Sequence, residues 1–251
     1  ATAGGVLHAR DVATGEWLWT GVGDNALKYP PVIANGCVYA SSDENTYAFD
    51  ARTGTGLWTA AEGGWLTIAQ GKLCVARFNG TLSAYNLDAA WTPPPLPPPP
   101  PPPAAAVWPT FAGGPRHTGE NSAETGYPPA TTSWSVRLGT RPLNPAVLSN
   151  GRVFATASTW FDPQTFLWAR NLANGSTAWT RDFGDIAGLG HPAVERGRVY
   201  VQEDGASNGT FLWCIDEAAG APIWASPFQS QGGRYWAPTI DDGSVFLGAG
   251  S

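Results

Sequence analysis

A spaced motif occurs four times in the chain, and this repeat constrains the fold more than any other feature of the sequence. In each copy a small residue stands two positions before an Asp or Asn. A Gly follows the Asp or Asn by four positions, and a Trp follows the Gly by four positions. The copies are Ala9-Asp11-Gly15-Trp19, Ala48-Asp50-Gly54-Trp58, Ala169-Asn171-Gly175-Trp179 and Cys214-Asp216-Gly220-Trp224. Four copies of one spacing indicate a structural unit that is repeated along the chain.

A second pattern fills the interval between copies of the first. It consists of Pro-x-Val or Pro-x-Ile, a Gly turn and an alternating apolar segment, and it begins at Pro30, Pro145, Pro192 and Pro238, with a weaker copy over 65–75. Asn-Gly pairs, which favour tight hairpins, begin at Asn35, Asn79, Asn150, Asn174 and Asn208. Each unit is therefore predicted to contain four short antiparallel strands. The third strand ends at the motif Asp, and the fourth carries the motif Trp.

Each residue of the motif has a physical role in such a unit. The Asp accepts hydrogen bonds from backbone N–H groups of the turn, and the Gly supplies a positive φ. The Trp can pack between neighbouring units, which accounts for many of the 13 tryptophans. No useful length of sequence has the 3.6-residue period of a helix. Four-stranded repeats of about 40–45 residues predict an all-β protein, a β-propeller with about five blades present.

The repeats resemble the pyrroloquinoline-quinone-type propeller repeats, whose units end in A-x-D-x-x-T-G-x-x-x-W. The segments 108–111 (Trp-Pro-Thr-Phe) and 116–119 (Arg-His-Thr-Gly) also resemble the sequence that opens such propellers. The family includes quinoprotein dehydrogenases and the cofactor-free propellers of bacterial outer-membrane assembly. The resemblance therefore implies the fold strongly and an activity only weakly.

The units are in an unusual order along the chain. Residues 132–138 have the pattern of a fourth strand without the preceding three, whereas 65–87 supply the first three strands without a fourth. We expect 132–138 to complete the blade begun at 65–87, which would protect a sheet edge. Residues 1–19 likewise hold third and fourth strands, and 236–251 hold first and second strands. The chain is then either one circularly permuted five-bladed ring, with residues 5–9 paired to 244–248, or part of a longer propeller array.

A proline tract divides the chain into two sets of blades. Residues 1–91 hold blades that match the C-terminal part of the family's repeat order, and residues 108–251 hold blades that match its N-terminal part. Residues 92–107 form the linker between them. Its ten prolines predict a polyproline II rod of about 34 Å that cannot lie within a sheet. The tract could be a stiff spacer, a docking site for proline-recognising domains, or a segment similar to the hydroxylated, glycosylated prolines of plant and algal surface glycoproteins. The candidate residues for hydroxylation or O-glycosylation are Pro93, Pro94, Pro95, Pro97, Pro98, Pro99, Pro100, Pro101, Pro102 and Pro103.

The charge and the cysteines exclude several classes of protein. A net charge of −6 with 14 Lys and Arg argues against nucleic acid as a partner, and no apolar stretch is long enough for a membrane span. Three scattered cysteines fit neither a zinc site nor a disulfide scaffold, and we expect small buried thiols. Sequons at Asn79, Asn174 and Asn208 permit N-glycosylation, so glycans are a further candidate for the surface. We expect an extracellular or cell-surface location.

Enzyme activity is not expected, and neither is a cofactor or a metal. The resemblance implies that a quinoprotein dehydrogenase would need calcium ligands, a catalytic Asp and, often, adjacent cysteines. Cys37, Cys74 and Cys214 are far apart, and the motif aspartates are already explained as turn formers. No spacing of His and carboxylate residues indicates a metal site.

The best candidate binding site is the mouth of the central channel, where innermost strands begin. Tyr29, Asn144 and His191 each precede the proline of a first strand, and Trp65 begins the weaker copy. These four residues could form a binding ring, or they could be ordinary packing at the channel rim. The sequence thus predicts a non-enzymatic, secreted or surface-displayed scaffold that binds protein partners or itself. The alternative is a propeller that binds a small ligand or carbohydrate, and a quinone-dependent dehydrogenase is the third hypothesis.

Overall fold

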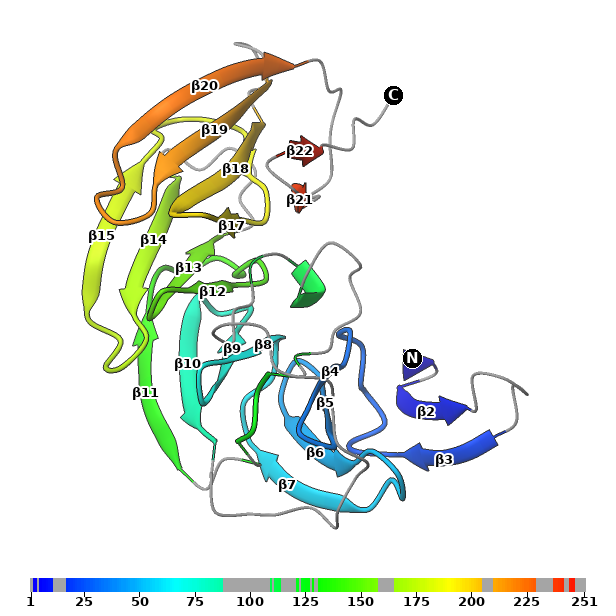
Figure 1. The fold of residues 1–251 in the computed structure, drawn as a ribbon. Helices are drawn as coiled ribbons and strands as arrows, with labels where there is room; N and C mark the ends of the chain where they lie inside the picture. The colour runs from blue at the N-terminus through cyan, green and yellow to red at the C-terminus, as the bar shows by residue number, and fades with distance from the viewer. Residues whose placement is uncertain are drawn as a thin grey trace.

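The structure is a computed structural model, and it describes residues 2–3, 5–10, 17–87, 109, 111–113, 121, 123–126, 128, 131–157, 165–204, 210–228, 237–241 and 244–246. In this part of the chain the only helix is the 3₁₀ turn η1 (Phe111–Gly113), and antiparallel sheets make up the rest of the regular structure. The sheets follow one another around an arc (Figure 1). The predicted all-β, propeller-type fold is confirmed. The proline tract and Asn208 lie outside the described residues.

Four of the sheets contain the predicted four strands in sequence order, from the inside of the arc outward. Their strands are β4 (Val32–Ala34), β5 (Cys37–Ser41), β6 (Thr46–Asp50), β7 (Gly56–Ala60); β8 (Trp65–Ala69), β9 (Lys72–Ala76), β10 (Thr81–Asn86), β11 (Thr132–Arg137); β12 (Val147–Ser149), β13 (Arg152–Thr156), β14 (Phe166–Asn171), β15 (Thr177–Asp182); and β17 (Ala193–Glu195), β18 (Arg198–Asp204), β19 (Thr210–Asp216), β20 (Pro222–Phe228). The last of these sheets gains a fifth strand, β16 (Gly188–Leu189), which also pairs with β18. The smaller end sheets are β1 (Thr2–Ala3), β2 (Val6–Arg10), β3 (Trp17–Gly21) and β21 (Thr239–Asp241), β22 (Ser244–Phe246).

Strand β11 completes the sheet of β8–β10, although about 45 residues separate it from β10 in the sequence. The two strands pair antiparallel, with Leu82 opposite Val136 and Ala84 opposite Trp134. This pairing confirms that 132–138 supply the fourth strand of the blade begun at 65–87. The N-terminal and C-terminal parts of the chain therefore share one sheet.

The single-ring alternative is not what the structure shows. It required residues 5–9 to pair with 244–248, but β2 pairs with β1 and β3, and β22 pairs with β21. In Figure 1 the first and last sheets lie at opposite ends of the arc, so the described sheets form an open arc rather than a closed ring.

A joint between a Trp and a Gly recurs between neighbouring sheets. The rings of Trp19, Trp134 and Trp179 cover the turn glycines Gly54, Gly175 and Gly220 of the next sheet so closely that a Cβ there would lie 2.6–2.8 Å from a ring atom. The indole Nε1 of each Trp donates a hydrogen bond to a backbone carbonyl of that turn, at 2.9 Å to Ala51, 2.8 Å to Leu172 and 2.9 Å to Glu217. The fourth-strand Trp thus packs between blades at these three joints, as the sequence predicted.

The turns have the conformations that the motif residues require. Asn35 and Gly36 both have positive φ, at 45° and 71°, and Asn150 and Gly151 repeat these values, which identifies tight hairpins of the primed type. The Oδ1 of Asp50 accepts backbone N–H groups of Arg52 and Thr53, each at 2.9 Å. The described motif aspartates therefore act as turn formers, since Asp216 accepts the N–H of Ala219 in the same way.

The core lies between the sheets rather than in one central cluster. Consecutive residues of β8, β9 and β13 are buried, and apolar side chains such as Ile68, Leu73, Phe154 and, on β14, Leu167 are fully buried. Cys37, Cys74 and Cys214 are buried, as expected, and they form no disulfide with one another. Burial raises the pKa of the Cys74 thiol to about 12.

Candidate functional site

Three of the four predicted rim residues meet in an aromatic cluster on the inside of the arc. Trp65 is at its centre, with ring centroids 4.9 Å from Tyr29 in an edge-on contact and 6.1 Å from His191. Tyr29 also approaches Phe78, at 6.2 Å, and Phe78 is half exposed. The residues come from β8, from the loop before β4, from the β9–β10 turn and from the loop before β17. Tyr29, Trp65 and His191, which share a position at the start of a first strand, thus lie close together, and their role in binding stays a prediction.

Phe111 is a member of this cluster that the sequence analysis did not single out. Its ring lies 5.8 Å from both Trp65 and His191, and it belongs to η1. The carbonyl of Pro109 accepts the backbone N–H of Val194 at 2.6 Å, which fastens this segment to the β17 strand. The Trp-Pro-Thr-Phe segment over 108–111 was noticed as a family signature, and that signature was the available signal for Phe111.

Asn144, the fourth predicted rim residue, does not stack in the aromatic cluster. Its Nδ2 donates to the Oγ1 of Thr156 at 2.9 Å and to the carbonyl of Leu189 at 3.0 Å. Thr156 in turn donates to the carbonyl of Gly190 at 2.9 Å. These bonds join the β12–β15 sheet to the loop that carries His191. Asn144 therefore holds the position of that loop.

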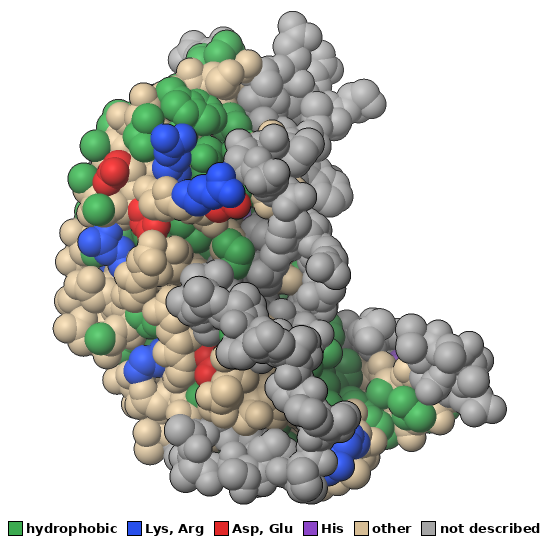
Figure 2. Space-filling model, in the orientation of Figure 1, with side chains coloured by type: hydrophobic (Ala, Val, Ile, Leu, Met, Phe, Trp, Pro, Cys, Tyr) green, Lys and Arg blue, Asp and Glu red, His purple; other side chains and the backbone are tan. Residues whose placement is uncertain are grey.

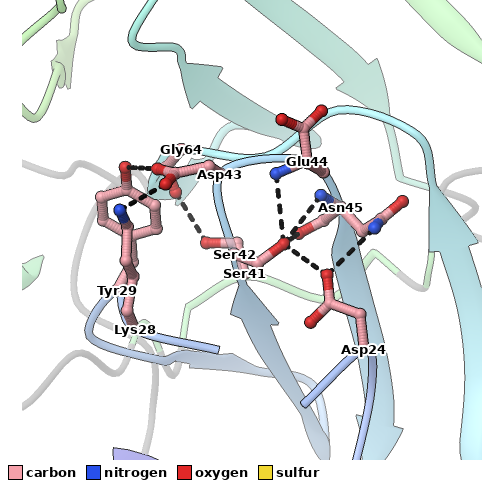
Figure 3. A network of polar contacts seen from close by, with 9 residues as sticks. All are labelled: Asp24, Lys28, Tyr29, Ser41, Ser42, Asp43, Glu44, Asn45 and Gly64. Atoms are coloured by element: carbon pink, nitrogen blue, oxygen red, sulfur yellow. Dashed lines mark hydrogen bonds and ion pairs between the residues drawn. The ribbon is translucent and has the colours of Figure 1, made fainter. Parts of the chain in front are cut away.

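A polar network adjoins Tyr29, and Figure 3 shows its members side by side. The Tyr29 hydroxyl donates to Asp43 at 2.6 Å, and the Lys28 ammonium forms an ion pair with the same carboxylate. Burial and then the bond to Asp43 raise the pKa of Tyr29. Burial alone would raise the pKa of Asp43, but the bonds from Lys28 and Tyr29 outweigh it and lower that pKa.

The second part of the network is centred on Asp24. The hydroxyl of Ser42 donates to its Oδ2 at 2.6 Å and the side-chain amide of Asn45 donates to the same oxygen at 3.0 Å. Burial acts to raise the pKa of Asp24, and these bonds lower it overall. Both carboxylates are thus held in the charged form as acceptors that fix loops. They are not arranged as a proton-transfer pair.

His191 is the most unusual titratable group of the cluster. It is nine-tenths buried against Trp65 and Phe111, and its Nδ1 has no hydrogen-bond partner within the described ranges. Burial lowers its pKa to about 4, because the charged imidazolium would lose its solvation. The neutral imidazole is therefore a packing group over the physiological pH range.

Among the residues that the structure describes, no three His, Cys, Asp or Glu side chains come together to hold a metal ion. A helix long and apolar enough to cross a membrane is not found in the described segments.

A family model described as "Outer membrane protein assembly factor BamB" matches residues 1–87 and 165–251, which together exceed half of the chain. The chain belongs to this family. The BamB match includes all four motif copies in full and most of the sheets of the arc, and it leaves out β11–β13. No curated protein matches the chain by sequence.

Solved structures share the BamB-type fold with the chain. BamB from Moraxella catarrhalis has a TM-score of 0.57 at 15% identity, and the match covers 92% of this chain and 61% of that one. Kuenenia stuttgartiensis hydrazine synthase has a TM-score of 0.62 at 10% identity, covering 94% and 64%. The quinohemoprotein alcohol dehydrogenase ADHIIG from Pseudomonas putida HK5 has a TM-score of 0.52 at 16% identity, covering 84% and 35%. The chain thus spans less than two thirds of each of these proteins.

Proposed function

We propose that the chain is a non-enzymatic scaffold module that binds proteins, either partners or further copies of itself, at the cell surface or in the extracellular space. One observation carries this proposal: two adjacent large apolar side chains are exposed on each of the outermost strands β3 and β20. On β3, Trp17 is 50% and Leu18 is 57% exposed, and on β20, Ile223 is 46% and Trp224 is 38% exposed. Figure 2 shows hydrophobic side chains over β19 and β20 at the top of the arc and beside β3 at the lower right.

Exposed apolar residues on edge strands are a favourable basis for protein binding. An outermost strand presents unpaired backbone N–H and C=O groups, so that a partner strand can add to the sheet while apolar side chains supply the contact area. Trp17 is also held in place, because the Arg10 guanidinium lies 4.9 Å from the centroid of its ring. A family description that refers to outer membrane protein assembly supports the same kind of function.

The non-enzymatic part of the proposal is supported by how the chain uses its polar residues. Asp50 and Asp216 accept backbone N–H groups in turns, and Asp24 and Asp43 fix loops. The three thiols are buried and distant from one another in sequence. None of these groups has the exposure and the partner that a catalytic residue needs.

The location is supported by two sequons in exposed turns. Asn79 and Asn174 are both exposed, and each Oδ1 accepts the N–H of the second residue after it, Thr81 and Ser176 respectively, at 3.0 Å. The acceptor amides are therefore accessible to a glycosyltransferase if the chain enters a secretory pathway. We include the proline residues 93–103 as sites of hydroxylation and O-glycosylation, and Asn208 as a third sequon.

Cross-linking mass spectrometry on the glycosylated, secreted chain tests the proposal. We expect cross-links to partner proteins or to other copies to concentrate on β3 and β20. Replacing both Leu18 and Ile223 with Ser should remove them, whereas the matched change Leu57→Ser on β7, an exposed residue at the same motif position, should not. Cross-links spread evenly over the surface, or quinone- and calcium-dependent reduction of a dye by the chain, would refute the scaffold function.

Carbohydrate binding at the channel rim is the alternative function. The half-exposed Phe78 beside Tyr29 offers a stacking surface for a sugar ring, with Lys28 and Asp43 as hydrogen-bonding groups. Binding of a defined glycan that is lost in Phe78→Ala, with an unchanged melting temperature, would support it.

A further inference from the structure

One blade departs from the others at the residue that follows the third strand. This position is Ala51 after β6, Leu87 after β10, Leu172 after β14 and Glu217 after β19. Leu87 and Leu172 are buried core residues. Glu217 is only 3% exposed, so a carboxylate is buried where the other blades have an apolar side chain. Such burial is unfavourable unless the charge is compensated.

The blade joint does not need this carboxylate. The indole of Trp179 donates to the backbone carbonyl of Glu217, as the indole of Trp134 does to the carbonyl of Leu172. The backbone N–H of Glu217 donates to the carbonyl of Gly197 at 3.0 Å. Both bonds are made by the backbone, and a Leu at this position makes the equivalent contact in the preceding sheet. The Glu217 side chain is therefore not needed for either of these two bonds.

The carboxylate of Glu217 also has spare hydrogen-bonding capacity. Its two oxygens accept from a single donor, the Nδ2 of Asn150, at 3.2 and 3.0 Å, whereas a carboxylate can accept about four hydrogen bonds. Arg152 is next to it, but the guanidinium donates to the backbone carbonyls of Glu217 and Ala218. Within the described residues Glu217 has no ion-pair partner.

A cavity opens beside this carboxylate, between the β12–β15 and β16–β20 sheets. Its volume is about 310 Å³, which lies in the size range of small-ligand sites, and its lining is Asn150, Arg152, Gly197, Asp216, Glu217 and Ala218. The lining carries two carboxylates and one guanidinium, so it is negative overall. One oxygen of Asp216 is used by the N–H of Ala219 at 2.7 Å, and the other remains as an acceptor.

We propose that this cavity binds a primary ammonium group on an alkyl stem. The three N–H donors of an ammonium match the open acceptors of Glu217 and Asp216, and Gly197 and Ala218 offer an uncharged wall for the stem. The guanidinium of Arg152, which also lines the cavity, donates to the backbone carbonyls of Glu217 and Ala218 and not to either carboxylate. The ammonium could come from a free alkylamine or from a lysine side chain of a protein partner. Only the second source rests on the scaffold function proposed above.

Calorimetric titration of the full chain tests the site with three probes: n-butylamine, N-acetyl-lysine methylamide and the uncharged N-acetyl-norleucine methylamide. We expect the ammonium compounds to bind and the norleucine compound not to bind. Because a hydrogen bond to a charged group is worth about 1.5–3 kcal/mol, Glu217→Leu should weaken binding by about tenfold or more. Binding of butylamine without the lysine compound would assign the site to free amines, and binding of both would assign it to lysine side chains as well.

The same variant provides a stability test that separates a ligand site from a structural one. Since Leu stands at this position in the preceding sheet, Glu217→Leu should keep or raise the melting temperature while it loses binding. The control Glu44→Leu, at a carboxylate outside the cavity, should leave amine binding unchanged. A large drop in melting temperature for Glu217→Leu, equal binding by wild type and variant, or no binding of either amine would overturn the proposal. None of these outcomes affects cross-linking at β3 and β20, so the scaffold function is judged separately.

Discussion

Replacing Gly175 with Ala should destabilise the protein because Trp134 occupies the space that a Cβ would need. The added Cβ would lie 2.7 Å from Cδ2 and Cε3 of the indole, well inside ordinary van der Waals distance, and Gly175 has φ +71°. The left-handed backbone conformation costs an Ala about 1–2 kcal/mol. Forcing a group into a filled space costs a further 1–3 kcal/mol, roughly. We therefore expect the free energy of unfolding to fall by about 2–5 kcal/mol.

Gly151→Ala is the matched control. Gly151 also has φ +71°, but no atom lies within 4 Å of the place where its Cβ would be. Gly151→Ala therefore has the conformational cost without the clash. The effect of Ala on the unfolded chain is the same in both variants, so it cancels in the comparison. We expect Gly175→Ala to be less stable than Gly151→Ala by about 1–3 kcal/mol.

Urea unfolding followed by far-ultraviolet circular dichroism measures both variants under identical conditions, with equal m-values as the check on comparability. A third variant, Trp134→Phe, keeps an aromatic ring but removes the donor to the carbonyl of Leu172, and it should cost about 1 kcal/mol. Equal losses of unfolding free energy in Gly175→Ala and Gly151→Ala would refute the view that close packing of the Trp ring on the Gly determines the joint between blades. The pairs Gly54 with Gly36 and Gly220 with Gly197 offer the same comparison at the other joints.

Three further predictions follow from the cluster, the thiols and the shared sheet. The imidazole of His191 binds a proton below about pH 6.5 in the unfolded chain but only below about pH 4 in the folded protein. The free energy of unfolding should therefore fall by up to about 3 kcal/mol as the pH decreases from about 6.5 to about 4. His191→Gln should reduce this dependence of stability on pH, and an unchanged dependence would contradict the burial of His191. The thiols of Cys37, Cys74 and Cys214 should resist a disulfide-exchange reagent until urea unfolds the chain, and rapid reaction of the native protein would show that they are accessible. A chain cut at a protease site inserted within 92–107 should elute as one complex in gel filtration because β10 and β11 pair, and separation of 1–91 from 108–251 would refute that pairing.

Much of the fold was predictable because its rules are local. The alternation of apolar residues with a period of two identifies strands, and Asn-Gly and Asp-x-x-x-Gly turns have few allowed conformations. The pairing of β11 with β10 was also predictable, since a three-strand unit and an isolated fourth strand complement each other within a repeat. The meeting of Tyr29, Trp65 and His191 followed from their common position at the start of first strands.

Other parts of the candidate sites depended on contacts between distant segments. Phe111 packs on Trp65 and His191 from a segment with no strand pattern, and Asn144 has a rim position but bonds to Thr156 and Leu189 instead of joining the cluster. Glu217 was visible in the sequence as the one acidic residue at an apolar position of the repeat. Its burial and the cavity beside it are properties of two sheets packed together.

The sequence by itself determined the four-strand repeat and its order along the chain, the turns between the repeated strands, and the residues that separate one blade from the next. Backbone sterics and side-chain periodicity act over a few residues, so a repeated spacing carries this information directly. Only the tertiary structure decided that the sheets form an open arc, that Phe111 covers the rim, and that a carboxylate is buried beside a cavity. These features depend on how far each sheet turns against its neighbour, and that turn is set by the combined packing of side chains far apart in the chain.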